Sequence, residues 1–210
     1  MMFNDIDFYF ITDSQLSKKG IFSDVKDAIN AGCKIIQYRE KNKDFDKMVN
    51  EAKHLKKNCE GKAIFLINDR LDIALGVDAD GVHIGKADVS FKDARKLLGN
   101  KKIIGLSIDN VKEAVDAEIA GADYVGLGPI FETSTKKDAG NPCGIKMLKN
   151  VRKNIMIPIV AIGGITKKNV ADVIINGADA VAAVSAVVGS DDVYGEVNDF
   201  INIIRECKST

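Results

Sequence analysis

Eight short apolar runs, rich in isoleucine and valine, recur along the chain and alternate with amphipathic stretches. The runs occupy residues 7–13, 34–40, 63–69, 81–85, 102–108, 124–130, 157–164 and 180–187. They are mostly apolar rather than strictly alternating, which is typical of strands in a parallel sheet that is covered on both faces. The pattern therefore predicts a parallel β-sheet whose strands are joined by helices.

The stretches between the runs show helical periodicity. In residues 44–58, apolar side chains return to one face every three or four positions, and Asp44 can cap the start of a helix. In residues 110–121, Asn110 can cap a second helix and Gly121 can end it. Each such helix would follow a strand, as in a βα unit.

This alternation favours a (β/α)8 barrel, the TIM barrel of the α/β class. The runs begin roughly 18 to 33 residues apart, close to the ~30-residue βαβ unit. With 210 residues, the chain has little length for an inserted subdomain, so we expect one catalytic domain over residues 1–210. A doubly wound open sheet is the alternative, but no GxGxxG motif follows the first run.

Composition narrows the class of function. The chain has 30 basic and 30 acidic residues, and this zero net charge argues against a general binder of nucleic acid or of anionic membranes. Its four cysteines lack CxxC spacing, which favours reduced thiols over a zinc site or a disulfide framework. We see no signal peptide and no apolar run of the ~20 residues needed to span a bilayer, so we expect a cytoplasmic protein.

Polar, charged or glycine residues follow nearly every run. In a (β/α)8 barrel the active site lies at the carboxyl ends of the strands. The residues at these ends are Gln37, Arg39, Lys41, Asn68, Asp69, His83, Asp88, Ser107, Thr133, Thr135, Lys136, Gly163, Gly164 and Ser185. We therefore expect them to gather at one mouth of the barrel.

The ends of the last two runs suggest a phosphate site. Gly163 and Gly164 would let backbone N–H groups approach an anion closely, and Ser185 can start a short helix whose N-terminus favours negative charge. Barrels often hold a phosphate in the loops after strands 7 and 8. The alternative is that these are ordinary turn glycines.

Asp69 and Asp88 follow neighbouring strands and suggest a cation site. Two carboxylates can hold one Mg²⁺ ion, which usually takes one or two carboxylates together with substrate phosphates. Arg39, Lys41 and Lys136 would then face the same polyanion. The alternative is that each aspartate caps the helix that follows it.

Two further features have more than one interpretation. The stretch GLGPIFETSTKKDAG, residues 126–140, places two threonines and two lysines directly after an apolar run. Hydroxyl and ammonium groups suit phosphate oxygens, but an ordinary solvated loop would look the same. His83 lies in the middle of its run, where a histidine that lines the barrel is more common than a catalyst.

Taken in order, these motifs identify a family. The pieces are Gln37-Tyr-Arg-Glu-Lys41, Asn68-Asp-Arg70, Gly81-Val-His-Ile-Gly85 with Asp88, Gly128-Pro-Ile-Phe131, Thr133-x-Thr-Lys-Lys-Asp138, Ile162-Gly-Gly-Ile165 and Val184-Ser-Ala186. Together they resemble thiamine-phosphate synthase, also called thiamine-phosphate pyrophosphorylase, over essentially the whole chain. The order and spacing carry the resemblance, because single pieces such as Ile-Gly-Gly-Ile occur in many phosphate-binding barrels.

The resemblance implies a transferase of thiamine biosynthesis with two small-molecule substrates, and it leaves a homo-oligomer possible. A hydroxymethylpyrimidine diphosphate reacts with a thiazole phosphate, which can be carboxylated, to give thiamine phosphate and diphosphate. The implied catalytic residues are Arg39, Lys41, Ser107 and Lys136, with Mg²⁺ on Asp69 and Asp88. In the family, Gln37, Asn68 and Ser107 also meet the pyrimidine diphosphate. The thiazole phosphate is met by Thr133, Thr135, Gly164, Val184 and Ser185.

Some positions depart from the family pattern. Ile108 and Asp109 follow Ser107 where a small or hydroxyl residue and then histidine are common. Lys86 takes a place often held by glutamine, and Glu132 a place often held by proline. The departures at Lys86 and Asp109 put local substrate contacts in question.

Three other functions remain as alternatives. A thiazole tautomerase of the same barrel group would act without a diphosphate partner and would not need two metal-binding carboxylates. Another phosphate-binding isomerase would share the glycine loops but would place an acid–base pair at the strand ends. A non-catalytic sensor of thiamine phosphate would bind its ligand without turnover.

Overall fold

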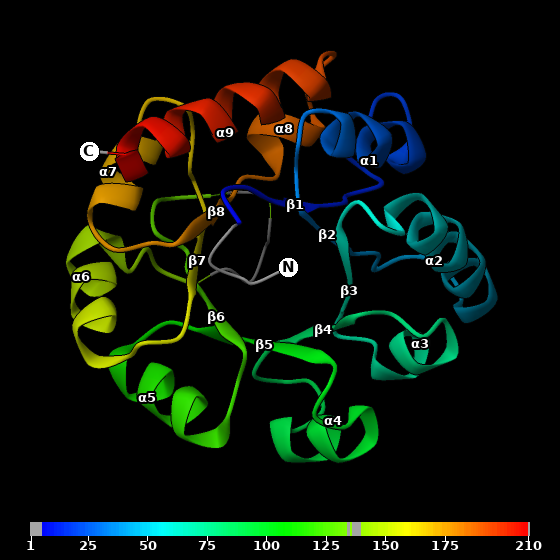
Figure 1. The fold of residues 1–210 in the computed structure, drawn as a ribbon, viewed down its shortest axis with the longest axis horizontal. Helices are drawn as coiled ribbons and strands as arrows, with labels where there is room; N and C mark the ends of the chain where they lie inside the picture. Colours follow the sequence, from blue (N-terminus) through cyan, green and yellow to red (C-terminus); the bar gives the residue numbers. More distant parts are fainter. Residues whose placement is uncertain (1–5, 134, 136–139, 210) are drawn as a thin grey trace.

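The structure, a computed structural model, describes residues 6–133, 135 and 140–209, and it shows the (β/α)8 barrel predicted from the sequence. Eight parallel strands form the central ring in Figure 1, and the helices surround it. The strands are β1 (Tyr9–Ile11), β2 (Ile35–Tyr38), β3 (Ile64–Asn68), β4 (Gly81–Ile84), β5 (Ile103–Ile108), β6 (Tyr124–Leu127), β7 (Ile159–Ile162) and β8 (Ala180–Ala182).

The order of the strands rules out the open doubly wound sheet. Each strand pairs in parallel with the next, in the sequence β1 to β8. A parallel bridge between Phe8 and Val181 joins the first strand to the last and closes the ring. The last predicted run, residues 180–187, is longer than its strand, which covers only Ala180–Ala182, and the short helix expected to start at Ser185 is confirmed.

Helices cover the outside of the ring. They are α1 (Ile21–Asn30), α2 (Phe45–Cys59), α3 (Leu71–Gly76), α4 (Phe91–Leu98), α5 (Val111–Ala120), α6 (Gly144–Asn154), α7 (Val170–Ile175), α8 (Ser185–Val188) and α9 (Val193–Ser209). The predicted caps are confirmed: the side chain of Asp44 accepts a hydrogen bond at the start of α2, and that of Asn110 does so at α5. Helix α9 packs against α1 and α7 and thereby covers the junction between the first and last strands (Figure 1).

The apolar core has two layers. Inside the ring, Tyr9, Ile35 and Leu66 belong to a small cluster of buried side chains. Outside the ring, Phe8 and Phe10 belong to a larger cluster between the strands and the helices. Since successive side chains of a strand point to opposite faces, both faces of each strand are buried, which explains why the runs lack strict alternation. None of the helices in the described part of the chain combines the length and apolarity that a membrane-spanning segment needs.

Aspartates in the turns that lead into three strands fasten the amino-terminal end of the barrel. Each carboxylate accepts a hydrogen bond from a backbone N–H at the start of the preceding strand. The pairs are Phe65 N to Asp80 at 2.7 Å, Ile104 N to Asp123 at 2.8 Å and Ile159 N to Asp179 at 2.8 Å. Two of these aspartates end the segment Gly-Ala-Asp, which occurs at residues 121–123 and 177–179, so this repeated segment has a structural role.

This arrangement predicts a stability effect without an effect on catalysis. Asp179→Ala removes the acceptor of the Ile159 N–H and of Arg152, whose Nη1 lies 2.9 Å from the carboxylate. We expect a loss of roughly 1–2 kcal/mol in the free energy of unfolding, or roughly 2 to 8 °C in Tm, because hydrogen bonds to charged groups are lost. Thermal unfolding and a turnover assay would check this. Asp116→Ala is the matched control, since its partner Lys112 is exposed, and an equal fall in Tm there would contradict the assignment.

Candidate active site

A buried carboxylate organises the loop that follows β2. Glu40 is only 7% exposed and accepts hydrogen bonds from the backbone N–H groups of Lys41, at 2.8 Å, and Asn42, at 2.9 Å. The hydroxyl of Ser14 also donates to it, at 2.6 Å. Burial alone would raise the pKa of Glu40, but these hydrogen bonds outweigh burial and lower that pKa. The ionised carboxylate therefore fixes the backbone that presents Arg39 and Lys41.

Arg39 lies at the mouth of the barrel between β1 and β2. Its Nη1 atom lies 3.1 Å from a carboxylate oxygen of Asp13, and its backbone N–H donates to the hydroxyl of Thr12 at 2.9 Å. Gln37, two residues earlier on β2, is 3% exposed and belongs to the barrel interior. The end of β2 thus supplies one buried amide and one partly exposed guanidinium.

The carboxyl ends of β3 and β4 bring three predicted site residues together. The ammonium group of Lys41 forms an ion pair with the carboxylate of Asp69. The carboxyl groups of Asp69 and Asp88 also lie close enough to shift each other's pKa. Asp88 is held in place by the backbone N–H of Gly85, which donates to its Oδ2 atom at 2.7 Å. Asp69 itself has a left-handed backbone with φ of 59°, an uncommon conformation that is found more often at functional sites.

The two aspartates differ in proton affinity. Burial would raise the pKa of Asp69, but hydrogen bonds from Asp88 and Lys41 lower it on balance. Burial raises the pKa of Asp88, and its hydrogen bond to Asp69 raises it further. The pair is therefore arranged to hold one positive charge between two carboxyl groups, either a proton or a hard cation with oxygen ligands.

The donor set fits a metal ion that is shared with a substrate. Among the described residues, no group of three or more histidine, cysteine, aspartate or glutamate side chains could hold a metal. Two carboxylates alone match Mg²⁺ with its remaining ligands taken from water and phosphate oxygens. The described side chains that fit this ion are those of Asp69 and Asp88.

The alternative that these aspartates cap helices is wrong. Helix α3 follows Arg70 and has no side-chain cap. Helix α4 is capped by Ser90, whose hydroxyl accepts from the backbone N–H of Asp93 at 3.1 Å. Neither Asp69 nor Asp88 therefore caps the helix that follows it, and both carboxyl groups need another explanation.

The loop after β6 meets the glycines after β7. The backbone N–H of Phe131 donates to the carbonyl of Gly163 at 3.0 Å. A Cβ atom on Gly164 would lie 2.4 Å from the carbonyl oxygen of Glu132, so only glycine allows this approach. In the same loop, the backbone N–H of Thr135 donates to the hydroxyl of Thr133 at 3.3 Å. These contacts place the loop with the two threonines directly beside the glycine turn.

The end of β8 lies next to this glycine turn. Strand β8 pairs with β7 through Ala182 and Ile162, and Ser185 is the first residue of α8. The carbonyl of Val184 accepts a hydrogen bond from the backbone N–H of Val188 at 2.8 Å. The predicted grouping of Gly164, Val184 and Ser185 is thus consistent with the fold. Lys136 lies outside the described residues.

Strands β3 to β5 bring the remaining predicted residues to the same end of the barrel. Asn68 ends β3 and pairs in register with His83 on β4. The Nε2 atom of His83 lies 2.9 Å from the hydroxyl of Ser107 on β5. His83 therefore lines the barrel, as its place in the sequence suggests, and it contacts a predicted substrate-binding residue.

Two of the departures from the family pattern, Lys86 and Asp109, contact each other. The ammonium group of Lys86 lies 2.7 Å from a carboxylate oxygen of Asp109 and 2.6 Å from one of Glu113. The resulting ion pairs raise the pKa of Lys86, although burial works against them. The lysine at position 86 therefore forms an ion pair with the aspartate at position 109, so the two departures compensate each other's charge.

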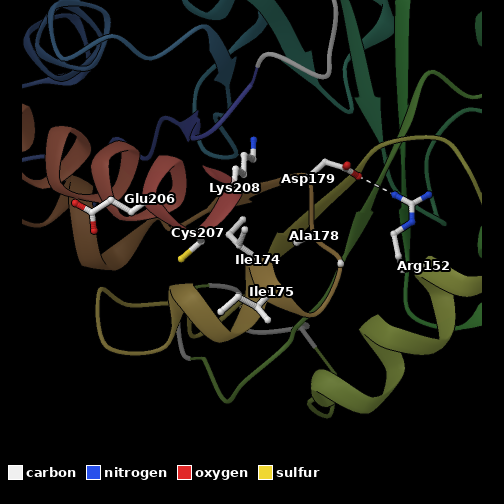
Figure 2. Close-up of a pocket in the computed structure, with 9 residues that line it drawn as sticks. Arg152, Ile174, Ile175, Ala178, Asp179, Glu206, Cys207 and Lys208 are labelled. Carbon is white, nitrogen blue, oxygen red and sulfur yellow. Dashed lines mark hydrogen bonds and ion pairs between the residues drawn. The ribbon is translucent and has the colours of Figure 1, made fainter. Parts of the chain in front are cut away.

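A shallow hollow of ≈ 830 Å³ lies elsewhere, between α6, α7 and α9 (Figure 2). Its lining includes Ala178 and Asp179, which directly precede β8, so it belongs to the amino-terminal end of the strands. Active sites of this fold lie at the opposite end. We therefore place the site at the carboxyl ends of the strands, not in this hollow.

Comparisons with known proteins agree with this geometry. The sequence model of the family described as thiamine monophosphate synthase matches residues 8–187. The chain belongs to the thiamine monophosphate synthase family. It is 60% identical to a thiamine-phosphate synthase of Methanosarcina mazei over 100% of this chain and 87% of that protein. It is 57% identical to a thiamine-phosphate synthase of Methanosarcina barkeri over 99% of this chain and 94% of that protein.

A solved structure supports the same family. The chain superposes on thiamine phosphate pyrophosphorylase from Pyrococcus furiosus with a TM-score of 0.90 and 37% identity, covering 97% of this chain and 98% of that one. The resemblance inferred from the motifs is confirmed, and with it thiamine-phosphate synthase as the function. The sequence analysis assigned no role to Glu40, Tyr9 or Tyr124, which hold predicted site residues in place through hydrogen bonds.

Proposed function

We propose that this transferase joins a hydroxymethylpyrimidine diphosphate to a thiazole phosphate, forming thiamine phosphate and releasing diphosphate, with Mg²⁺ as its cofactor. The observation that carries the proposal is the ion pair of Lys41 with Asp69, next to the carboxyl group of Asp88, at the carboxyl ends of the strands. No helix cap explains the two carboxyl groups. A family of thiamine-phosphate synthases supplies the reaction that would use them.

Diphosphate is a good leaving group only when its negative charge is neutralised. Held by Asp69 and Asp88, Mg²⁺ would supply part of that neutralisation. Arg39 offers a planar fork for two phosphate oxygens, and Lys41 offers a point charge that its partner Asp69 already holds at the site. Lys136, from the loop after β6, is proposed as a third cation.

The pyrimidine side of the reaction needs orientation more than acid–base catalysis. An electron-rich aminopyrimidine can support positive charge on its methylene carbon as the C–O bond breaks. The thiazole nitrogen then captures that carbon. We assign Gln37, Asn68 and Ser107 to hold the pyrimidine diphosphate in place, and we assign no general base.

The thiazole phosphate would bind across the ends of β7 and β8. The backbone at Gly164, which has φ of 64° and no room for a side chain, can bring its N–H groups close to phosphate oxygens. Thr133 and Thr135 supply hydroxyl groups from the adjoining loop, while Val184 and Ser185 border the site from β8. Closure of that loop over the substrates would keep water away from a reactive cation.

The proposal also includes the domain organisation of the protein. We propose that residues 1–210 act as one catalytic domain, since every assigned side chain comes from one barrel. A homo-oligomer stays a prediction. A thiazole tautomerase would bind the same thiazole phosphate, but it would leave Asp69, Asp88 and Lys41 without a diphosphate to contact.

The test is an assay of the purified protein with each substrate alone and with both together, in the presence of Mg²⁺. The proposal predicts thiamine phosphate only when both substrates are present. An altered thiazole phosphate formed without the pyrimidine would favour the tautomerase. Ligand binding by a folded protein with no product in any mixture would favour a non-catalytic sensor.

A further inference from the structure

The loop between β2 and α2 carries two lysines with different surroundings. Lys41 lies at the mouth of the barrel, where it pairs with Asp69. Lys43 belongs instead to a network of ion pairs: its ammonium group lies 2.6 Å from a carboxylate oxygen of Glu51 and 3.3 Å from one of Glu40. Lys43 therefore joins a carboxylate of the loop to a carboxylate of helix α2.

Glu51 connects this network to the strand that precedes the loop. It lies on α2, and its Oε2 atom accepts a hydrogen bond from the hydroxyl of Tyr38 at 2.7 Å. Tyr38 is the last residue of β2. The other carboxylate oxygen of Glu51, Oε1, accepts from the ammonium group of Lys43. One carboxylate of the helix is therefore shared by the end of the strand and the loop that follows it.

Glu40 carries this tether to the backbone of the loop. Its side chain is 2% exposed, and its Oε2 atom contacts both Lys43 and the hydroxyl of Ser14. Its Oε1 atom accepts hydrogen bonds from the backbone N–H groups of Lys41 and Asn42. A buried carboxylate that loses its cationic partner is strongly unfavourable. Removing Lys43 therefore favours an opened loop in which Glu40 is hydrated.

The members of the network keep their charges and protons near neutral pH. Burial alone would lower the pKa of Lys43, but its contacts with Glu51 and Glu40 raise that pKa on balance. Burial raises the pKa of the Tyr38 phenol well above its usual range, and the contact with Glu51 raises it further. The ion pairs and the hydrogen bond from Tyr38 are therefore maintained under the conditions of an ordinary assay.

We propose that Lys43 and Glu51 are positioning residues for the diphosphate end of the substrate, because they hold the loop between β2 and α2 in place. The inference rests on the proposed function, in which Arg39 and Lys41 of this loop neutralise the diphosphate. Lys43 and Glu51 act through Glu40 and the backbone of the loop rather than by contact with the substrate. The proposed thiazole phosphate site, at the ends of β6, β7 and β8, is built from other loops.

The test measures the binding of inorganic diphosphate in the presence of Mg²⁺, by titration calorimetry at a temperature where the variants are folded. Lys43→Met removes the charge and keeps a side chain of similar length. We expect its Kd for diphosphate to rise about tenfold, because a misplacement of about 1 Å can cost up to about 10²-fold. Lys43→Arg keeps the charge and should retain the affinity of the wild-type protein.

Glu51→Gln is a second variant, which leaves no buried carboxylate without a cation. It keeps an oxygen that can accept from Tyr38, and Lys43 stays paired with Glu40. We expect it to fold and to show a smaller rise in Kd for diphosphate, because only the link between the loop and the helix is weakened. Should Lys43→Met fail to fold, an unchanged Kd in Glu51→Gln would overturn the proposal on its own.

Lys47→Met is the matched control. Lys47 lies in the first turn of the same helix and pairs with Asp44 at 2.9 Å, but both side chains are mostly exposed. Exposed ion pairs contribute little, so the Kd for diphosphate should stay unchanged. An unchanged Kd in folded Lys43→Met, or an equal rise in Lys47→Met, would overturn the proposal.

Turnover kinetics distinguish positioning from a general loss of stability. In Lys43→Met, KM for the pyrimidine diphosphate should rise, whereas KM for the thiazole phosphate should stay unchanged. A general loss of stability would lower Tm without this difference between the two substrates. An equal rise in both KM values would overturn the positioning role.

Hydrogen exchange separates a failure of this inference from a failure of the proposed function, because it needs no ligand. The amides of Lys41 and Asn42, which donate to Glu40, should exchange slowly in the wild-type protein and in Lys43→Arg. They should exchange at least about tenfold faster in Lys43→Met. Unchanged exchange in Lys43→Met would overturn the inference. Faster exchange there, with a wild-type protein that forms no thiamine phosphate, would overturn the proposed function and leave the anchoring of the loop supported.

Discussion

Asp69→Ala and Asp88→Ala are each expected to abolish Mg²⁺-dependent turnover while the fold persists. The two carboxyl groups lie close enough to shift each other's pKa, and two carboxylates fit a hard cation that takes its other ligands from water and phosphate. Removing either one would leave the leaving diphosphate short of neutralising charge. We expect kcat to fall by at least about 10³-fold, since losing even one group that stabilises developing charge often costs about 10²–10³-fold. Turnover measured against Mg²⁺ concentration would check this.

The test of Asp69 needs a substitution that the left-handed backbone at this residue can accommodate. Because Asp69 has φ of 59°, alanine there adds strain, whereas asparagine tolerates this conformation. Asp69→Asn should therefore fold normally and still lose activity. Asp72→Ala is the control in the same segment, since that carboxylate pairs with Arg70 at 2.6 Å. Full activity in both Asp69→Asn and Asp88→Ala would show that the metal assignment is wrong.

Gly164→Ala is expected to weaken use of the thiazole phosphate strongly. The new Cβ atom would lie 2.4 Å from the carbonyl oxygen of Glu132 and 2.7 Å from Cβ of Phe131, so the loop after β6 would have to move. A misplacement of about 1 Å can cost about 10²-fold in rate, and we expect a loss of that size in kcat/KM for the thiazole phosphate. Steady-state kinetics with the thiazole phosphate varied would measure it.

Gly61→Ala is the control for Gly164→Ala, because it introduces the same backbone strain without a steric clash. Gly61 has φ of 68°, close to the 64° of Gly164, but a Cβ atom there would meet nothing within 4 Å. Both variants should lose stability because both place alanine in the left-handed region, and Gly164→Ala should lose more because its Cβ atom also clashes with the neighbouring loop. Equal kinetics for the two variants would show that the glycine turn does not shape the thiazole site.

The barrel could be predicted from the sequence because its signals are local. The run at residues 157–164 and the strand Ile159–Ile162 describe the same element, and Asp44 caps α2 as its residue type suggests. The last strand of the barrel was harder to delimit from the sequence. Residues 180–187 form one largely apolar run because β8 and α8 are both buried, so the pattern does not show that the strand ends at Ala182, although Ser185 was expected to start a helix.

The site could be predicted only in part. Asp69 and Asp88 follow strands, so the rule for the carboxyl ends of a barrel brings them together. Tyr9 and Tyr124 lie 115 residues apart and look like ordinary members of apolar runs. Their hydroxyl groups meet only because both face the interior, and runs buried on both faces do not show which residues point inward. Glu40 is similar, since its burial depends on Ser14 and on the turn of the backbone around it.

The most direct test of the account is to measure both products of the wild-type protein with and without a chelator. With Mg²⁺, the protein should form thiamine phosphate and diphosphate in equal amounts. The chelator should remove both products, and added Mg²⁺ should restore them together. Full product formation in the chelator, or thiamine phosphate formed without diphosphate, would contradict the account.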